Sequence, residues 1–479
     1  MQRIPSGPSQ PLYSAAATRT LEAALATTLP PHTLMQRAGL ATARLALAIA
    51  PHARTYWIAC GPGNNGGDGL EAAMHLQQWG KKPLVTWLGT ADTVPTDTRA
   101  SHARALAAGV RFVDAPPADC DACIDALLGT GASRAPEGRL ADWIAHINTL
   151  SVPVLAVDLP SGLQADTGTT PGPCVRASHT LCLLTLKPGL YTAQGRDQTG
   201  EVWYESLGAE VMSAAPQASL AGAPAAAARR HATHKGSYGD VAVIGGARGM
   251  GGAALLAASA ALHHGAGRVY VGLLDGGDMM VDPTHPELMF RTPAALDAAA
   301  LTVVAGCGGG QAIAAQLPRL LSTAARLLLD ADALNSIAND SQLAALLAAR
   351  SARQRQTVLT PHPLEAARLL ACTIAAVQAD RLAAAQQLAQ RFGCTVVLKG
   401  SGTVMAAPGR LPVINPTGNA RLATAGTGDV LAGLIGARLA QGETAFEAAC
   451  AAVWLHGQAA DSWPQDQALT AGALAQAIV

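Results

Sequence analysis

The first half of the chain alternates short apolar runs with longer stretches in which apolar residues recur at helical spacing. This spacing predicts helices over Thr18–Leu29, Thr33–Ile49 and Leu70–Trp79. The apolar runs predict strands over Thr55–Cys60, Pro83–Leu88, Ala122–Leu128, Val152–Val157 and Thr180–Thr185. Runs that are apolar throughout, instead of at every second residue, are typical of a parallel sheet covered by helices on both faces. We therefore expect an α/β domain in the first half.

A second set of signals occupies residues 233–479. A helix is predicted over Gly252–His264, and a long helix follows Asp429. Strands are predicted over Val241–Ile244, Arg268–Leu273, Thr302–Ala305, Leu327–Leu329, Val358–Leu359, Thr395–Leu398 and Val404–Ala406. The alternation again predicts an α/β domain.

Residues 213–232 separate the two patterns. Within them, Ser213–Ala228 is rich in Ala, Ser, Pro and Gly and has no apolar period, which is typical of a linker. An alanine-rich helix is the alternative, but Pro216 and Pro224 would interrupt it. The predicted organisation is a domain over residues 1–212, a linker over 213–232 and a second domain over 233–479.

The amino-acid composition and net charge argue for some classes of protein and against others. The chain has 479 residues, of which 49% are hydrophobic and 14% charged, so two well-buried globular domains are expected. Formal net charge is +0 and aromatic residues make up 4%, which argues against a nucleic-acid surface. No apolar stretch reaches membrane length and no targeting signal is recognisable, so we expect a cytoplasmic protein that contacts neither nucleic acid nor membrane.

The cysteines fit the same compartment. Their number, 9, is odd and they are scattered along apolar segments, as expected of reduced thiols. Cys120 and Cys123 form a single CxxC pair with no second pair at ligand spacing, and we expect no metal or redox role for it.

A glycine-rich segment, GPGNNGGDG at Gly61–Gly69, follows the first predicted strand. We interpret its 5 glycines as serving a bound anion and not packing. Two further segments, Asp125–Gly131 and Asp158–Gly162, also follow strands, and ligands in such sheets bind at the carboxyl ends of the strands. Asp158 is placed for acid–base chemistry, although a turn-forming or helix-capping role would explain it equally well. Asn65, Asp125 and Ser161 offer the oxygen ligands that suit a hard cation.

The second half carries more polar and glycine-rich segments. Each lies next to a predicted strand or opens a predicted helix: Lys235–Gly239, Gly306–Gly309, Asp330–Asn335, Thr360–Glu365, Lys399–Thr403 and Gly426–Asp429. Together they offer a phosphate clamp, charge neutralisation and a base, which phosphoryl transfer requires. His362 taken alone could equally be a structural histidine, and the glycine turn before Asp429 could merely start a helix.

The motifs taken together resemble two known families. GPGNNGGDG, LLGTG and VDLPSG resemble the NAD(P)H-hydrate epimerase domain, which implies a Rossmann-like parallel sheet. KGSYG, DADALN, TPHPLE, KGSGT and AGTGDVLAG resemble the ADP/ATP-dependent NAD(P)H-hydrate dehydratases, which implies a ribokinase-like α/β domain. Their order in one chain resembles the bifunctional NAD(P)H-hydrate repair enzymes of bacteria.

The resemblance assigns roles to individual residues. In the first domain it implies that the hydrate is bound by Asn64, Asn65, Gly66, Gly67, Asp68, Gly129, Thr130, Gly131, Ala132, Ser133, Arg134, Ala135 and Asp158, with Asp158 as the catalytic group. It implies potassium at Asn65, Asp125 and Ser161. In the second domain it implies that the hydrate meets Ala253, Gly308, His362 and the catalytic Asp429. The nucleotide, ADP with Mg²⁺, would be held by Lys399, Gly400, Ser401, Gly402, Thr403 and Gly428.

The expected activity is therefore repair of hydrated NADH and NADPH. The first domain would interconvert the R and S epimers, and the second would dehydrate the S epimer with ADP as donor, yielding AMP and phosphate. We also expect a homo-oligomer. Two other classes remain open: a small-molecule kinase of the vitamin-precursor type, and a first domain that only binds nucleotide or partners. Cys307 stands where the family usually has Pro, so the turn at Gly306–Gly308 is less fixed.

Overall fold

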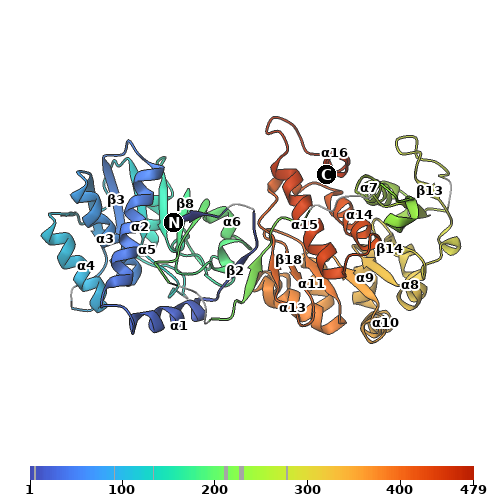
Figure 1. The fold of residues 1–479 in the computed structure, drawn as a ribbon, viewed down its shortest axis with the longest axis horizontal. Coiled ribbons are helices and arrows are strands. Elements are labelled where there is room, and N and C mark those ends of the chain that lie inside the picture. Colours follow the sequence, from blue (N-terminus) through green and yellow to red (C-terminus); the bar gives the residue numbers. More distant parts are fainter. Residues whose placement is uncertain are drawn as a thin grey trace. The chain divides into compact units, whose positions relative to one another are not determined.

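The computed structural model describes residues 1–4, 7–90, 92–132, 134–209, 214–225, 231–276 and 279–478. The chain divides into two compact units, Met1–Ala218 and Ser219–Val479 (Figure 1). Within the described residues, no helix is both long enough and apolar enough to cross a lipid bilayer.

The first unit is a sheet with helices on both faces. Its strands run in the order β1-β9-β8-β7-β6-β3-β4-β5, and all neighbours are parallel except β1 and β9. The strands of this unit are β1 Gln2–Arg3, β2 Gln10–Leu12, β3 Thr55–Cys60, β4 Lys82–Trp87, β5 Arg111–Phe112, β6 Ala122–Ala126, β7 Val154–Val157, β8 His179–Leu183 and β9 Glu201–Glu205. Its helices are α1 Ala15–Ala26, α2 Thr33–Ile49, α3 Asn64–Gln78, α4 Thr96–Ala107, α5 Arg139–Ile147 and α6 Gly195–Gln198.

Alternating side chains of β3 explain the two layers of the core. Tyr56 and Ile58 pack on one face with residues of α2 and α3. Trp57 and Ala59 pack on the other face with residues of α5. Because both faces are buried, the strand is apolar from Tyr56 to Cys60, and only its partly buried first residue, Thr55, is polar.

The second unit is a larger sheet that is parallel over most of its width. Its strands run in the order β13-β12-β11-β14-β15-β16-β17-β18-β19-β10, and β18 is antiparallel to both neighbours. The strands are β10 Ala218–Leu220, β11 Asp240–Ala247, β12 Arg268–Leu274, β13 Met289–Phe290, β14 Thr302–Ala305, β15 Arg326–Leu329, β16 Gln356–Leu359, β17 Thr395–Leu398, β18 Val404–Ala406 and β19 Val413–Ile414.

Helices cover this sheet too. Residues of α7, α14, α15 and α16 share one hydrophobic core with β11, β12 and β14, while α10 and α13 contact β16 and β17. The helices are α7 Gly251–His263, α8 Leu317–Thr323, α9 Asp332–Asn339, α10 Ser341–Ala352, α11 Pro363–Leu370, α12 Ile374–Ala379, α13 Arg381–Phe392, α14 Thr427–Ala440, α15 Ala445–Asp461 and α16 Ala471–Ala477. The predicted fold class, α/β in both halves, is confirmed.

The division between the units falls inside the range predicted as a linker. Three residues of that range form β10, which pairs with β19, and Leu220 is fully buried. The expectation of a linker did not include β10, because three residues are too short for a periodicity to register. Ser213 lies outside the described residues. The limits 212 and 233 of the two domains stay a prediction.

Candidate active sites

The glycines of the segment after β3, except Gly63, lie where the backbone is tightly packed. A Cβ at Gly61 would come within 1.8 Å of the carbonyl oxygen of Leu127, and one at Gly66 within 2.0 Å of the carbonyl oxygen of Gly61. A Cβ at Gly67 or Gly69 would also collide, with the side chains of α2 and β6. The interpretation that these glycines do not serve packing is therefore wrong. They let the segment pass close to the end of β6.

The segment is helical earlier than the sequence suggested. α3 begins at Asn64, six residues before the predicted start at Leu70, so Asn64–Asp68 form its first turn. The amides of a first helical turn point away from the helix and attract anions. Asn65 is anchored there, because its side-chain nitrogen donates to the carbonyl oxygen of Leu128 at 3.1 Å. The turn therefore presents amides and the Asp68 carboxyl at the carboxyl end of β3.

Asp125 and Ser161 form a buried pair between β6 and the turn after β7. Ser161 donates to Asp125 twice, from its hydroxyl at 2.6 Å and from its amide at 2.8 Å, and the amide of Leu127 donates at 3.2 Å. The Asp125 side chain is fully buried, and burial raises its pKa to about 6 although the bonds from Ser161 act in the opposite direction. No cationic side chain is paired with Asp125 among the described residues.

The side-chain oxygen atoms at this position fit a hard monovalent cation. All three proposed ligand side chains, of Asn65, Asp125 and Ser161, offer oxygen, and a buried carboxyl with a raised pKa would be stabilised as the anion by a nearby positive charge.

Asp158 occupies a strained turn and forms a buried ion pair. It follows β7 with φ 65°, a left-handed conformation that is unusual for a residue with a side chain. Its carboxylate accepts from the ammonium group of Lys187 and, at 3.1 Å, from the amide of Leu183. Burial is the strongest single influence on the pKa of Lys187 and acts to lower it, but the charges of Asp158 and Cys182 and the hydrogen bonds to both together raise it. The Lys187 side chain is thus held as an ammonium group.

Sequence reasoning missed Lys187. It follows the strand predicted over Thr180–Thr185 and precedes Pro188-Gly189, so the same rule that selected the other strand ends could have found it. Its side chain is completely buried and also donates to the carbonyl oxygen of Leu183 at 2.8 Å.

The loop after β6 contacts neighbouring elements at several points. Arg19 of α1 donates to the carbonyl oxygen of Thr130 at 3.4 Å, and Gln164 donates to that of Ala132 at 3.3 Å. Gly172 lies against Ala135, since a Cβ on Gly172 would be 2.9 Å from that of Ala135. Of the other predicted residues here, Gly129 lies beside Asn65 and Arg134 is exposed, while Ser133 lies outside the described residues.

The carboxyl groups of the first site influence one another. Burial raises the pKa of Asp68 well above its usual value, and the charges of Asp158 and Glu22 raise it further. Glu22 of α1 shows the same behaviour, with burial first and Asp158 second. Glu22 belongs to no motif, and no feature of the sequence pointed to it.

In the second unit, Asp429 lies in the first turn of α14. That helix is capped by Gly426 with φ 90°, a conformation that favours glycine. Burial and the charge of Asp330 raise the pKa of Asp429 to about 6, while Cys307 and Lys399 act to lower it. A carboxyl with a pKa near 6 is ionised at neutral pH and still basic enough to accept a proton.

Cys307 donates a hydrogen bond to this carboxyl. Its side chain is fully buried, and burial raises its pKa well above the usual value, so the thiol is protonated. The sulfur and the carboxylate oxygens of Asp330 and Asp429 lie within 4.8 Å of one another. The residue that departs from the family pattern thus touches the candidate base directly.

Asp330 links this cluster to the nucleotide segment. It accepts from the ammonium group of Lys399 at 2.7 Å and from the hydroxyl of Thr360 at 2.8 Å. Burial is the strongest single influence on the pKa of Lys399 and acts to lower it, but Asp330, Glu365 and Cys307 together raise it. A Cβ on Gly428 would be 3.4 Å from the Lys399 nitrogen, so the structure brings those two predicted residues together.

The turn at 399–403 connects β17 and β18. Gly400 has φ 134°, and the guanidinium of Arg381 lies directly against it while donating to the carbonyl oxygens of Leu398 and Lys399, both at 3.1 Å. The hydroxyl of Thr403 donates to the carbonyl oxygen of Gly400 at 3.0 Å. Ser401 at the tip is exposed and Gly402 is buried.

Four residues are expected to meet the hydrate, and one of them, Asp429, is described above. Of the other three, Gly308 and Ala253 form a close pair, and His362 caps a helix. A Cβ on Gly308 would lie 2.9 Å from that of Ala253, so these two are in contact. His362 caps α11: its Nδ1 accepts from the amides of Leu364 and Glu365 at 3.1 and 3.3 Å. Burial and the charge of Lys399 lower its pKa. This cap is the structural role that the sequence left open, and the Nε2 atom of the ring lies 3.2 Å from the Glu365 carboxylate.

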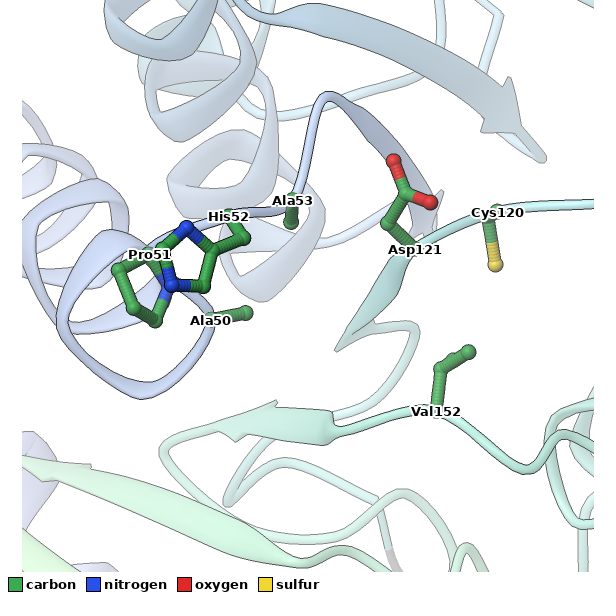
Figure 2. A pocket seen from close by; sticks show the side chains of 7 residues that line it. All are labelled: Ala50, Pro51, His52, Ala53, Cys120, Asp121 and Val152. Atoms are coloured by element: carbon green, nitrogen blue, oxygen red, sulfur yellow. The ribbon is translucent and has the colours of Figure 1, made fainter.

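A separate recess lies at the amino ends of β3, β6 and β7 in the first sheet. Figure 2 shows His52 and Asp121 on its two sides, with Cys120 beside Asp121. The Asp121 carboxylate accepts from the amides of Arg54 and Thr55, both at 2.8 Å. This recess borders the amino ends of the strands, away from the carboxyl ends where the candidate residues gather.

Comparisons with known proteins agree with this division. A family model described as YjeF-related protein N-terminus matches residues 31–189, and one described as NAD(P)H-hydrate dehydratase matches residues 241–479. The bifunctional NAD(P)H-hydrate repair enzyme of Escherichia coli is 39% identical over 450 residues, covering 89% of this chain and 84% of that protein. The ADP-dependent (S)-NAD(P)H-hydrate dehydratase of Neisseria meningitidis is 47% identical and covers 52% of this chain and 85% of that protein.

A solved structure is similar to one half of the chain. It is the ADP/ATP-dependent NAD(P)H-hydrate dehydratase of Bacillus subtilis co-crystallised with ATP and Mg²⁺, which is 30% identical with a TM-score of 0.45. The match covers 52% of this chain and 91% of that chain.

Each of the two α/β units has interacting carboxyl groups at the carboxyl ends of its strands, where such sheets bind ligands. Together with the relatives named above, this arrangement is that of an enzyme. The similarity to the Escherichia coli protein extends through both units. The chain belongs to the family of bifunctional NAD(P)H-hydrate repair enzymes.

Proposed function

We propose that this enzyme restores hydrated NADH and NADPH in two steps. The first unit epimerises the R and S hydrates at the carbon that carries the hydroxyl group. The second unit phosphorylates that hydroxyl on the S epimer with ADP and eliminates phosphate, giving NAD(P)H and AMP. The names of the relatives from Escherichia coli and Neisseria meningitidis support this reading. Residence in the cytoplasm and assembly as a homo-oligomer stay predictions.

In the first unit, Asp158 is the proposed acid–base group. Its strained turn and its ion pair with Lys187 fix the carboxylate at the end of β7. The hydrate would be bound by the first turn of α3 (Asn64–Asp68) and by the loop after β6 (Gly129–Ala135), together with Asp158. The amides of the helix start suit the phosphate groups of the dinucleotide.

Potassium is the proposed cation of the first unit. Asn65, Asp125 and Ser161 would hold it, and it would supply positive charge beside the substrate-binding turn of α3. Support comes from the chemistry of the donors, which are all oxygen, and from the burial of Asp125 without a cationic partner.

In the second unit, Asp429 is the proposed base. It would take the proton of the substrate hydroxyl as that oxygen attacks the β-phosphorus of ADP, while the amides at the start of α14 stabilise the transferred group. The ring nitrogen lone pair then expels phosphate, which is a far better leaving group than hydroxide. Ala253, Gly308 and His362 would contact the hydrate.

The adenine nucleotide would lie along the turn at 399–403 and Gly428. ADP enters as its Mg²⁺ complex, which neutralises phosphate charge during transfer. ADP is favoured over ATP as donor because the relative from Neisseria meningitidis is named as ADP-dependent.

The observation that carries this proposal is the Asp429 carboxyl with a pKa of about 6, placed at the start of α14 beside Lys399. The test supplies purified S hydrate and ADP and analyses the products. The proposal expects AMP, free phosphate and NAD(P)H in equal amounts. A stable phosphorylated dinucleotide would identify a kinase instead.

A further inference from the structure

Helix α1 is tied to the candidate epimerase site at three points. Its first amide, of Ala15, donates to the Asp166 carboxylate at 2.7 Å. The hydroxyls of Thr18 and Thr185 are 2.6 Å apart and buried, and Arg19 reaches Thr130. The helix therefore extends from the turn after β8, which carries Lys187, to the loop after β6. Figure 1 shows α1 along one end of this unit.

These contacts determine where the Glu22 side chain of α1 points. It is four residues after Thr18 and three after Arg19, so it lies on the same face of the helix. That face is directed to the carboxyl ends of the strands. Glu22 is partly buried, and burial together with the Asp158 charge raises its pKa. The charged groups that act on it are Asp158, Lys187, Asp97 of α4 and Arg19 of its own helix, and it acts in turn on Asp68.

The site therefore holds two carboxyl groups in different surroundings. The Asp158 carboxylate is paired with the Lys187 ammonium group. Glu22 has no cationic partner within salt-bridge distance among the described residues, and the nearby anion favours its neutral form. Two carboxyls that different surroundings push apart are the usual arrangement for an acid and a base acting together.

Epimerisation of a carbon that carries a hydroxyl next to a ring nitrogen needs such a pair. If the C–O bond breaks on one face and re-forms on the other, one group must protonate the departing oxygen and another must deprotonate the entering water. Resting on the epimerase function proposed above, we propose that Glu22 is the second acid–base group of the first site, opposite Asp158 across the substrate ring.

The step balances without any further reactant. Neutral Glu22 gives its proton to the substrate hydroxyl, and the C–O bond breaks as the ring nitrogen lone pair forms a C=N bond; water departs. A second water adds to the other face, its oxygen bonds to the carbon, and the C=N electrons return to nitrogen. Asp158 accepts the proton of this water. In the reverse direction the two carboxyls exchange roles.

The test measures epimerisation by the full-length enzyme in ¹⁸O-labelled water. In the wild type, each inversion should place one solvent oxygen in the product hydroxyl. Glu22→Gln should lower kcat by ~10²–10⁴-fold, with a KM for the hydrate close to that of the wild type. The bell-shaped pH profile of kcat should reduce to a single limb. The control is Glu201→Gln, which removes an exposed carboxylate at the amino end of β9 and should behave as the wild type.

A second variant addresses folding. Glu22→Ala leaves space beside the ring, and added formate should restore part of its kcat if only a proton donor is missing. A Glu22→Gln enzyme that keeps both kcat and the bell-shaped profile would overturn the proposal, and so would inversion that retains the original oxygen. The proposal would also be overturned if Glu22→Gln lost kcat but kept both limbs of the pH profile and formate did not restore the Glu22→Ala enzyme. That result would show that Glu22 has a structural role. If the wild type itself does not epimerise, the function proposed for the first unit fails instead.

Discussion

Replacing Asp429 by Asn should slow dehydration and at the same time stabilise the second unit at neutral pH. The variant keeps the size of the side chain and an oxygen that can accept from the Cys307 thiol, but it removes the base. Loss of a general base typically lowers the rate by ~10²–10⁴-fold, so we expect dehydration to fall within that range. Affinity for ADP should change little, because the proposed nucleotide contacts lie in the turn at 399–403 and at Gly428.

The same substitution should stabilise the second unit at neutral pH. Folding raises the Asp429 pKa from 3.8 to about 6, so the protonated form is favoured in the folded state. The stability linked to this group is fully present below about pH 4 and is lost as the pH rises through 6. The pKa shift corresponds to a loss of at most about 3 kcal/mol of unfolding free energy at neutral pH. Because Asn carries no charge, the variant does not lose this free energy.

The assay compares wild type, Asp429→Asn and the matched control Glu447→Gln, which changes an exposed carboxylate on α15. Dehydration is followed by the absorbance of reduced nicotinamide, and thermal unfolding is recorded at about pH 4 and pH 8. The melting temperature of Asp429→Asn should exceed that of the wild type at the higher pH, and the difference should shrink at the lower. Near-normal dehydration by Asp429→Asn would refute the role of the base. A variant less stable than the wild type at pH 8 would refute the pKa argument.

Three further outcomes are expected. Lys187→Met leaves the Asp158 carboxylate without its buried partner, so epimerisation should be lost and chemical denaturation should show a cost of about 3–5 kcal/mol in the first unit. Cys307→Pro removes a hydrogen bond that lowers the Asp429 pKa, so the acid limb of the dehydration pH profile should move to higher pH; an unchanged limb contradicts this. Replacing potassium with a large organic cation should slow epimerisation and leave dehydration unaffected, as measured on the two reactions separately.

Much of the fold follows from the sequence because buried parallel strands leave a clear trace. Thr55–Cys60 and Thr33–Ile49 coincide with β3 and α2 as predicted. Short or mixed strands at the sheet margins were not predicted; β9, for instance, is GluValTrpTyrGlu, with charged ends and half-buried aromatic residues. Such strands carry too few apolar positions to be distinguished from loops.

The candidate sites were predictable where a motif marks a strand end. Asp125 and Ser161 are in contact, as the convergence of their segments at the strand ends suggested, and Lys399 lies against Gly428 at the start of α14. The start of α3 was placed too late because glycine is a poor helix former, and here the tight packing of Gly66 overrides that preference. Glu22 was missed because only the fold turns that helix face toward the site.

One chain with both proposed activities should return both epimers of the hydrate to the intact cofactor. The most direct measurement incubates the full-length enzyme with an epimer mixture, with and without excess ADP, and follows the absorbance of reduced nicotinamide to completion. With ADP, the whole mixture should be converted to NAD(P)H, with one AMP formed per cofactor. Without ADP, no NAD(P)H should form, while the R and S hydrates interconvert. Recovery that stops at the S fraction would contradict an active first unit, and accumulation of a phosphorylated dinucleotide would contradict the dehydratase.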